Sequence, residues 1–256
     1  MIKIKKQNEI ELLRVAGSIT AGALDEISKY IKPGISTLEL DKIAEKYIIN
    51  KGAKPAFLRY DGFPNSICAS IDDVVVHGIP KSDMILQEGQ IIGIDLGAKY
   101  KGYYGDAART FAVGNIDNEK QKLIQVTKQC FFEAIKNLKE GSRLGDIGFE
   151  VERHAQRNGF EPVHQMGGHG VGKDLHEDPF VPMYGRAGTG IKLEAGMVLA
   201  IEPMINMGSH EIKVNGWNVR TADGMPSAHY ENTVLITKNG VEILTKTADL
   251  EANNLE

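Results

Sequence analysis

The sequence has few cysteines and no long apolar run, and each absence excludes a class of protein. Two cysteines in 256 residues, Cys68 and Cys130, allow neither a disulfide framework nor a zinc site built on cysteine. No stretch has the apolar length that a membrane-spanning helix needs, and the basic start of the chain is not followed by the apolar core of a signal peptide. The sequence therefore predicts a cytoplasmic protein with no membrane partner.

A strong excess of charge is also missing. The formal net charge is −4, which gives no support for nucleic acid as a partner. Charged residues make up 25% of the chain and apolar residues 42%, as in ordinary globular proteins. Because no linker rich in proline, glycine or serine interrupts it, residues 1–256 are expected to form a single domain with one fused core.

What is present is a repeat with a long period. Gly34, Gly52, Gly89 and Asp95 have counterparts 107 residues later, namely Gly141, Gly159, Gly196 and Glu202. A period this long is too large for a solenoid, so we expect two related halves, approximately residues 8–115 and 116–250, that face each other across a pseudo-twofold axis. This arrangement would bring Asp95 and Glu202 together. At a separation of about 4 Å and an effective dielectric near 20, two carboxylates would repel by roughly 4 kcal/mol, so a cation is expected between them.

Local patterns predict an α+β architecture, with helices outside a curved antiparallel sheet. Helices are expected at residues 8–31, 36–50, 118–138 and 142–157, and strands at 67–71, 74–77, 90–96, 107–113, 198–205 and 233–236. Ser36 and Glu39 match a capping box, which would open the second helix.

Four carboxylates lie at the ends of near-apolar strands, where an acid is unfavourable unless it is paired or bound to a metal. Asp95 and Glu202 each end a strand, and Asp106 and Glu231 each begin one. Any one of them could be a strand-end acid that faces water, but four in matched positions favour a metal site. The step from Asp95 to Asp106 is 11 residues and that from Glu202 to Glu231 is 29, which indicates an inserted hairpin near residues 208–224.

Histidines add candidate imidazole ligands. His169 lies in the glycine-rich segment 167–172, where absent side chains let the backbone approach a site closely, and His77 and His176 also lie near turn residues. The remaining histidines are interpreted as structural or surface residues: His154, His164, His210 and His229. Several carboxylates with one imidazole suit a pair of divalent ions such as Mn, Fe, Co or Zn, but not a tetrahedral structural zinc.

The same glycine-rich segment nearly matches a phosphate-binding loop, with Lys173 after Gly172. The next residue is Asp174, not the serine or threonine that would hold magnesium. Pro179 and Pro182 would interrupt the long helix that should follow. A nucleotide site is therefore not expected.

Seven sequence blocks, in order and over nearly the whole chain, resemble the motifs of type I methionine aminopeptidases. They are residues 77–80 (HGIP), 94–97 (IDLG), 105–110 (GDAART), 168–172 (GHGVG), 175–177 (LHE), 200–203 (AIEP) and 230–233 (YENT). The resemblance implies the duplicated α+β fold called pita-bread, with residues 1–256 as a single catalytic domain. It also implies a metalloaminopeptidase that removes the initiator methionine from nascent proteins and peptides whose second residue is small.

The resemblance further implies roles for individual residues. Two divalent ions would be held by five ligands: Asp95, Asp106, His169, Glu202 and Glu231. Asp106 and Glu231 would bridge the ions. Glu202 would also act as the general base on a water that the ions activate. His176 would stabilise the developing oxyanion, and His77 would contact the scissile amide or its leaving nitrogen.

Five further residues resemble the pocket in which this family binds the methionine side chain: Phe57, Tyr60, Phe63, Cys68 and Trp217. A thioether packs favourably against aromatic edges, although each of these residues by itself would more often belong to an ordinary core. The pattern is loose here, because Phe57 and Leu175 occupy positions that vary among members of the family.

Three interpretations of the function remain. The type I enzyme is favoured over type II, because the 26 residues from His176 to Glu202 leave no room for the helical insertion of type II enzymes. A related metallopeptidase of the same fold comes next. A non-catalytic module that binds peptides or proteins comes last, because such modules typically lose ligands. A monomer is expected; the physiological metal and docking at the ribosome stay open.

Overall fold

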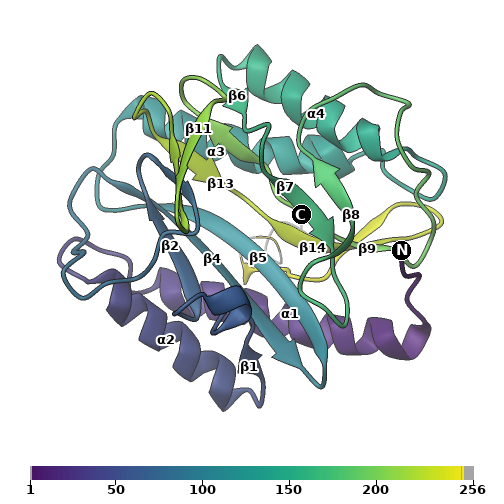
Figure 1. Cartoon of the computed structure of the whole chain (residues 1–256), viewed down its shortest axis with the longest axis horizontal. Helices are drawn as coiled ribbons and strands as arrows, with labels where there is room; N and C mark the ends of the chain where they lie inside the picture. The colour runs from purple at the N-terminus through teal and green to yellow at the C-terminus, as the bar shows by residue number, and fades with distance from the viewer. Residues whose placement is uncertain (1, 249, 251–256) are drawn as a thin grey trace.

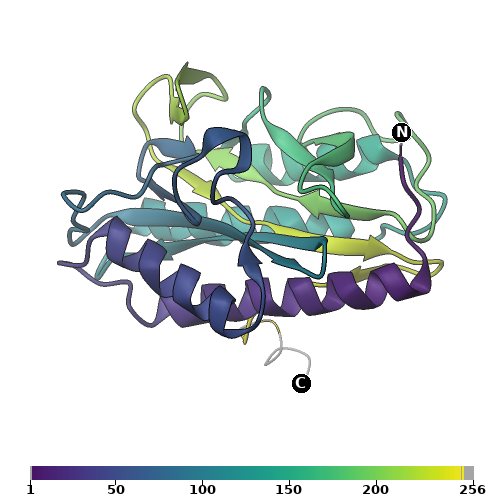
Figure 2. The ribbon, with the colours of Figure 1, turned by 60° about the horizontal axis from the view of Figure 1, so that its bottom comes forward.

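Two pairs of helices lie against the outer faces of the strands (Figure 1). The computed structural model describes residues 2–248 and 250. Helices α1 (Gln7–Ser28) and α2 (Thr37–Asn50) pack on the strands of the first half of the chain, and α3 (Asn118–Ile135) and α4 (Leu144–Arg157) pack on strands of the second half. In Figure 2, α1 and α2 lie beneath the strands, and hairpins and loops rise on the opposite side. Within residues 2–248 and 250, no helix is both long and apolar enough to cross a membrane.

The start of α2 follows from the local sequence. The Ser36 hydroxyl accepts a hydrogen bond from the Glu39 N–H at 3.2 Å, and the Glu39 carboxylate accepts one from the Ser36 N–H at 2.9 Å. These two bonds satisfy N–H groups that the first turn of a helix leaves without intrahelical partners. The predicted capping box is therefore confirmed.

A long antiparallel hairpin carries the first pair of acids. It consists of β4 (Ile91–Tyr100) and β5 (Tyr103–Ala112). Strands β2 (Ile67–Ile71) and β1 (Lys54–Pro55) pair with β4 along its other edge, also antiparallel. The hairpin thus runs through the middle of the first half, directly above α1 in Figure 2.

A second antiparallel sheet carries the other pair of acids. Its strands are, in spatial order, β15 (Val241–Ile243), β14 (Asn232–Ile236), β9 (Val198–Ile201), β7 (Gly167–Gly170) and β8 (Glu177–Pro182). Glu202 directly follows β9 and Glu231 directly precedes β14. Because Asn232 pairs with Ile201, the two acids lie at the same end of neighbouring strands.

Shorter strands complete the structure. They are β3 (Val74–Val76), β6 (Glu161–Pro162), β10 (Met204–Asn206), β11 (Ile212–Asn215), β12 (Asn218–Thr221) and β13 (Ser227–His229), with a short 3-10 helix at Tyr60–Gly62. Strands β11 and β12 form the hairpin that the sequence predicts near residues 208–224, so this prediction is confirmed.

The strand predicted over residues 198–205 is interrupted. β9 ends at Ile201, and β10 begins at Met204 with different partners, β13 and β6. Pro203 has no N–H to donate to a neighbouring strand, which explains a break at this point. The prediction of one continuous strand was therefore wrong, and the interruption leaves Glu202 at the junction of two sheets.

Hydrogen bonds join β5 to β14 where the two halves meet. The Asp106 N–H donates to the Thr233 hydroxyl at 2.9 Å, and that hydroxyl donates to the Asp106 carbonyl at 2.8 Å. The Glu231 N–H donates to the Ala108 carbonyl at 2.9 Å. These bonds hold the backbones of Asp106 and Glu231 next to each other.

Hydrophobic layers between helices and strands support both sheets from behind. Leu24 and Ile94 are buried in the layer under β4, and Phe131 and Leu199 in the layer under β9. Each such side chain contributes about 1.5–3 kcal/mol when it is buried completely. The acids therefore lie on two pairs of strands that pack tightly against helices.

Candidate metal centre and cavity

The register of the β4–β5 hairpin places its two acids on one face. Asp95 lies opposite Ala108, and Asp106 lies opposite Gly97. Side chains alternate along a strand, so Asp95 and Asp106 are diagonal neighbours on the same side of the hairpin. Together with Glu202 and Glu231 from the second sheet, they line one cavity of about 510 Å³. We call Asp95, Asp106, Glu202, Glu231 and His169 the acid cluster.

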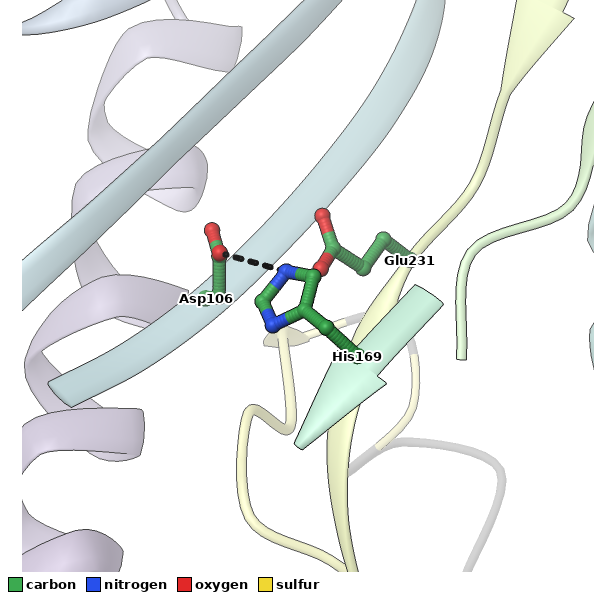
Figure 3. A group of neighbouring side chains, drawn as sticks. All are labelled: Asp106, His169 and Glu231. Atoms are coloured by element: carbon green, nitrogen blue, oxygen red, sulfur yellow. Dashed lines mark ion pairs between the residues drawn. The ribbon is translucent and has the colours of Figure 1, made fainter. Parts of the chain in front are cut away.

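His169 projects from β7 toward the acids (Figure 3). Its Nε2 lies 3.6 Å from Asp106 Oδ2 and 3.8 Å from Glu202 Oε1. Nδ1 lies 2.9 Å from the Gly170 carbonyl, which can only accept, so Nδ1 carries the proton and Nε2 presents a lone pair to the acids. Burial, and then the proximity of His176, lower the pKa of His169 to about 3, so the ring is neutral and can bind a metal.

The acids lack the partners that buried carboxylates need. Among the residues that the structure describes, Asp95 Oδ1, Asp106 Oδ1 and Glu231 Oε1 are buried without a hydrogen-bond partner. Burial raises the pKa of Asp106 to about 7. Burial, followed by repulsion from neighbouring carboxylates, also raises the pKa of Asp95, Glu202 and Glu231 well above the usual range. Such a cluster is unfavourable unless positive charge sits within it.

The donor set fits divalent metal ions. Asp106, His169 and Glu231 each offer one ligand atom, and these three atoms lie within 4.8 Å of one another. Figure 3 shows the three side chains. Hard carboxylate oxygens combined with one neutral imidazole suit first-row divalent ions. The unpartnered oxygens supply the lone pairs that such ions require. The structure thus brings together all five residues that the sequence predicts as ligands.

Both predicted substrate-facing histidines line the same cavity. His176 is exposed to it, and its Nδ1 lies 2.9 Å from the Tyr60 hydroxyl. His77 adopts φ = 59°, a left-handed conformation that is uncommon for residues other than glycine. Burial, and then the proximity of His176, lower the pKa of His77 to about 4. The strained backbone at His77 agrees with a place in a functional site.

Five residues predicted for the methionine pocket line the cavity and belong to one hydrophobic cluster: Phe57, Tyr60, Phe63, Cys68 and Trp217. We call them the aromatic wall. The Phe63 and Trp217 rings meet edge to face at 5.3 Å, and the His77 and Trp217 rings at 5.9 Å. Edge-to-face contacts fix ring orientations and leave an apolar surface toward the cavity. Leu175 lines the cavity as well.

The sequence analysis missed His229 as a neighbour of the site. This residue is 3% exposed, and its Nε2 lies 3.3 Å from Glu202 Oε2. One atom each of His229, Glu202 and Glu231 also lie within 4.8 Å of one another. The signal was its position two residues before Glu231, which places both side chains on the same side of an extended segment. A surface location, one of the two interpretations offered for His229, is therefore wrong.

The other three histidines lie away from the cavity lining. His154 Nε2 contacts Gln129 Oε1 at 3.2 Å near the surface. The His164 ring stacks between Tyr184, at 4.2 Å, and His210, at 4.3 Å. These contacts agree with structural or surface roles. The lining also includes Met166, Met204 and Phe180, which the sequence analysis did not single out.

Comparison with known proteins identifies the family. The profile of metallopeptidase family M24 matches residues 11–238. A methionine aminopeptidase of Clostridium perfringens is 51% identical over 247 residues, which cover 96% of this chain and 99% of the relative. Methionine aminopeptidase 1 of Bacillus subtilis is 47% identical over 248 residues, which cover 96% of this chain and 100% of the relative.

Solved structures agree with this similarity. The crystal structure of methionine aminopeptidase from Thermotoga maritima superposes with a TM-score of 0.95 at 43% identity, covering 96% of this chain and 100% of that chain. Prolidase from Pyrococcus furiosus superposes with a TM-score of 0.77 at 26% identity, covering 95% of this chain and 65% of that chain. These neighbours confirm the predicted α+β pita-bread fold. The chain therefore belongs to metallopeptidase family M24.

Proposed function

We propose that this protein is a metal-dependent aminopeptidase that removes N-terminal methionine from nascent proteins and peptides with a small second residue. The observation that carries the proposal is the meeting, in one cavity, of the acid cluster and the aromatic wall. The first supplies donors for metal ions, and the second is an apolar surface of the right chemistry for a thioether. The names of the similar proteins support the same activity.

We infer that the acid cluster holds two divalent ions, with Co, Mn, Fe and Zn as candidates. Asp95, Asp106, His169, Glu202 and Glu231 would be the ligands. Asp106 and Glu231 would bridge, since hydrogen bonds between β5 and β14 hold them side by side where the two sheets meet. Bound divalent ions lower the pKa of a water molecule and polarise the scissile carbonyl group.

Three side chains would move or hold protons during hydrolysis. Glu202 would accept a proton from the attacking water and pass it to the leaving amine. If the Tyr60 hydroxyl donates to His176 Nδ1, the imidazole carries its proton on Nε2 and can donate it to the developing oxyanion. His77, neutral because of its low pKa, would contact the scissile amide.

The aromatic wall would set the specificity for methionine. Phe57, Phe63 and Cys68 are buried, so the wall is preformed and excludes water from the bound side chain. Tyr60 and Trp217 complete it with a polar tip each. We further infer one catalytic domain of two related halves, a monomeric state and a cytoplasmic location. Docking at the ribosome is compatible with this function but is not needed for it.

Peptide cleavage by the metal-loaded protein tests the proposal. The protein would be stripped with a chelator and reloaded separately with Mn²⁺ or Co²⁺. We expect release of methionine from Met-Ala-Ser, little release from Met-Leu-Ser, and no cleavage of Leu-Ala-Ser. The chelated protein should be inactive. Cleavage of Xaa-Pro dipeptides in place of Met-Ala-Ser would instead identify a related metallopeptidase, and metal binding without any hydrolysis would identify a binding module.

A further inference from the structure

The segment that precedes α1 lies beside the loop that carries His176. In Figure 1 this segment runs from the N-terminus past the ends of β8 and β9 into α1. The Lys5 N–H donates to the Gly196 carbonyl at 2.9 Å, which fixes the backbone there. Lys5 is only 8% exposed, which is unusual for a lysine. Its ammonium group must therefore have a specific partner.

That partner is Glu177. Lys5 Nζ donates to Glu177 Oε2 at 2.6 Å, and the two side chains are 5% and 3% exposed. The other carboxylate oxygen, Oε1, accepts hydrogen bonds from the N–H groups of Lys173, at 3.0 Å, and Asp174, at 3.4 Å, and from Lys3 Nζ at 3.2 Å. Both oxygens of the carboxylate are thus used.

The atoms around the Lys5–Glu177 pair are closely packed. A Cβ atom at Gly172 would lie 2.5 Å from Glu177 Oε1 and 2.7 Å from Lys5 Cε, so a larger residue there would displace these two side chains. The Gly172 carbonyl in turn accepts a hydrogen bond from the Tyr104 N–H at 3.0 Å. Tyr104 therefore holds the first residue of the loop 172–177, and Lys5 holds the last.

Glu177 is the direct neighbour of His176, and both residues belong to the cavity lining. His176 lines the cavity, where its ring meets the His169 ring edge to face at 4.3 Å. Glu177 directs its carboxylate back to the N-terminal segment. His176 ends the bend at residues 172–176 and Glu177 begins β8, so holding the Glu177 side chain restrains the backbone that carries His176.

We propose that Lys5 and Glu177 are positioning residues that hold the loop 172–177, and through it the His176 imidazole, beside the acid cluster. The proposal rests on the proposed function for its effect on turnover, but its structural part stands independently. A buried ion pair is weak evidence for stability. Here both oxygens of Glu177 accept hydrogen bonds, and Lys5 Nζ donates to Glu177 and, at 3.2 Å, to the Lys3 carbonyl. Because Glu177 adjoins His176, the consequence of the pair is the placement of His176.

The principal test removes the charge of Lys5 with little change in length. In Lys5→Met, we expect kcat for Met-Ala-Ser to fall about tenfold, since small misplacements of a catalytic group cost up to about a hundredfold, while KM changes less. Lys5→Arg should restore most of the loss. The matched control is Lys173→Met, which removes an exposed charge from the same loop that pairs with Glu9 and not with Glu177. It should keep wild-type turnover.

A double-mutant cycle separates positioning from general support of the fold. If Lys5 acts through His176, then Lys5→Met should cost nothing further in a His176→Ala background. The same tenfold loss in both backgrounds would overturn the proposal. Should Lys5→Met fail to fold, Glu177→Gln takes its place in the cycle, because it keeps the shape of the side chain and loses its charge.

Hydrogen exchange supplies a readout that does not depend on activity. The amides of Lys173 and Asp174 donate to Glu177, so in Lys5→Met they should exchange at least about tenfold faster. The Val171 amide, which donates to the Val198 carbonyl at 3.0 Å, serves as the internal control. Unchanged protection at Lys173 and Asp174 would contradict the proposal. Faster exchange in a protein without aminopeptidase activity would support the loop contact and overturn the proposed function instead.

Discussion

The acid cluster and the aromatic wall line the same cavity, yet they are stabilised in opposite ways. The wall packs apolar and aromatic surfaces against one another, and this burial favours folding with or without a ligand. The cluster crowds carboxylates whose pKa values are raised by burial and, for Asp95, Glu202 and Glu231, also by mutual repulsion, which opposes folding until cations bind. The aromatic wall therefore stabilises the folded protein by itself, whereas the acid cluster depends on bound cations for its stability.

This difference suggests that the two groups of residues have separate roles: the aromatic wall selects the peptide, and the acid cluster binds the metal ions. Removing a residue of the wall should change which peptides are accepted but leave metal binding intact. Removing a residue of the cluster should change metal binding and chemistry but leave the shape of the wall intact. The following predictions test this division, beginning with the largest expected effect.

Asp106→Asn should remove metal and activity together. Asp106 is 3% exposed, lies beside His169 Nε2, and belongs to the group of three ligand atoms within 4.8 Å. An amide offers a weaker and uncharged donor, so bridging two cations fails. Metal content after dialysis and turnover of Met-Ala-Ser are the measurements.

His77→Ala is the matched control for this variant. His77 lines the cavity without belonging to the acid cluster, so the variant should keep both ions and lose mainly turnover. A two-ion Asp106→Asn protein with normal rates would rule out the dinuclear site.

Glu202→Gln should lower kcat by roughly 10²–10⁴, the range for a lost general base. The substitution keeps the size of the side chain and removes the proton acceptor. KM should change less, because the aromatic wall is untouched. Steady-state kinetics on Met-Ala-Ser with metal occupancy measured in parallel decide the matter. Near-normal turnover at full occupancy would exclude Glu202 as the base.

Trp217→Ala should act on specificity. Its ring contacts Phe63 and His77 edge to face, so its loss opens the wall. We expect kcat/KM for Met-Ala-Ser to fall by roughly 10–200-fold and the preference over Leu-Ala-Ser to narrow, as for other apolar pocket contacts. Metal content should stay at the wild-type level. Tyr30→Ala, which removes an exposed aromatic ring outside the cavity lining, is the control and should have no effect.

The smallest expected effect is a pH dependence of the metal-free protein. Folding raises the pKa of Asp106 from 3.8 to about 7, so its contribution to stability is present below pH about 4 and is lost as the pH rises toward 7. Burial of neutral His169, His77 and His229 acts in the opposite sense, because their pKa values fall to about 3, 4 and 3. The change in stability of the metal-free protein with pH therefore contains both contributions.

Comparison with Asp106→Asn isolates the carboxylate. In the presence of chelator, wild type should lose the stability that Asp106 contributes as the pH rises from 4 to 7, whereas the variant has no such contribution to lose. The melting temperature of the variant should therefore rise relative to that of wild type over this range. Thermal scans by circular dichroism across this range provide the measurement. A constant difference would mean that folding leaves the pKa of Asp106 unchanged, so that the carboxyl group loses its proton over the same pH range in the folded and the unfolded protein.

Much of the site could be predicted because its residues break local patterns. Asp95 and Glu202 interrupt apolar strands, and their spacing of 107 residues indicates two matched halves. Likewise, Ser36 and Glu39 begin α2 through contacts only three residues apart, which require no knowledge of the rest of the fold. Information of this kind is local or periodic and therefore readable from one sequence.

Other features depend on contacts between distant segments. Pro203 was visible in the sequence, yet the change of partners between β9 and β10 emerged only from the arrangement of the sheets. The sequence does not show that His229 lies against Glu202, because the distance depends on the pairing of β13 with β10, in which His229 lies opposite Met204.

Fold class, candidate ligands and the matched acids were thus decided by the amino-acid sequence, since periodicity and misplaced charges mark them. The pairing of Lys5 with Glu177, 172 residues apart, was decided only by tertiary structure. A lysine near a chain start and a glutamate after a histidine are each unremarkable in sequence. They meet because the N-terminal segment packs against the loop between β7 and β8, and burial then leaves each charge no better partner than the other.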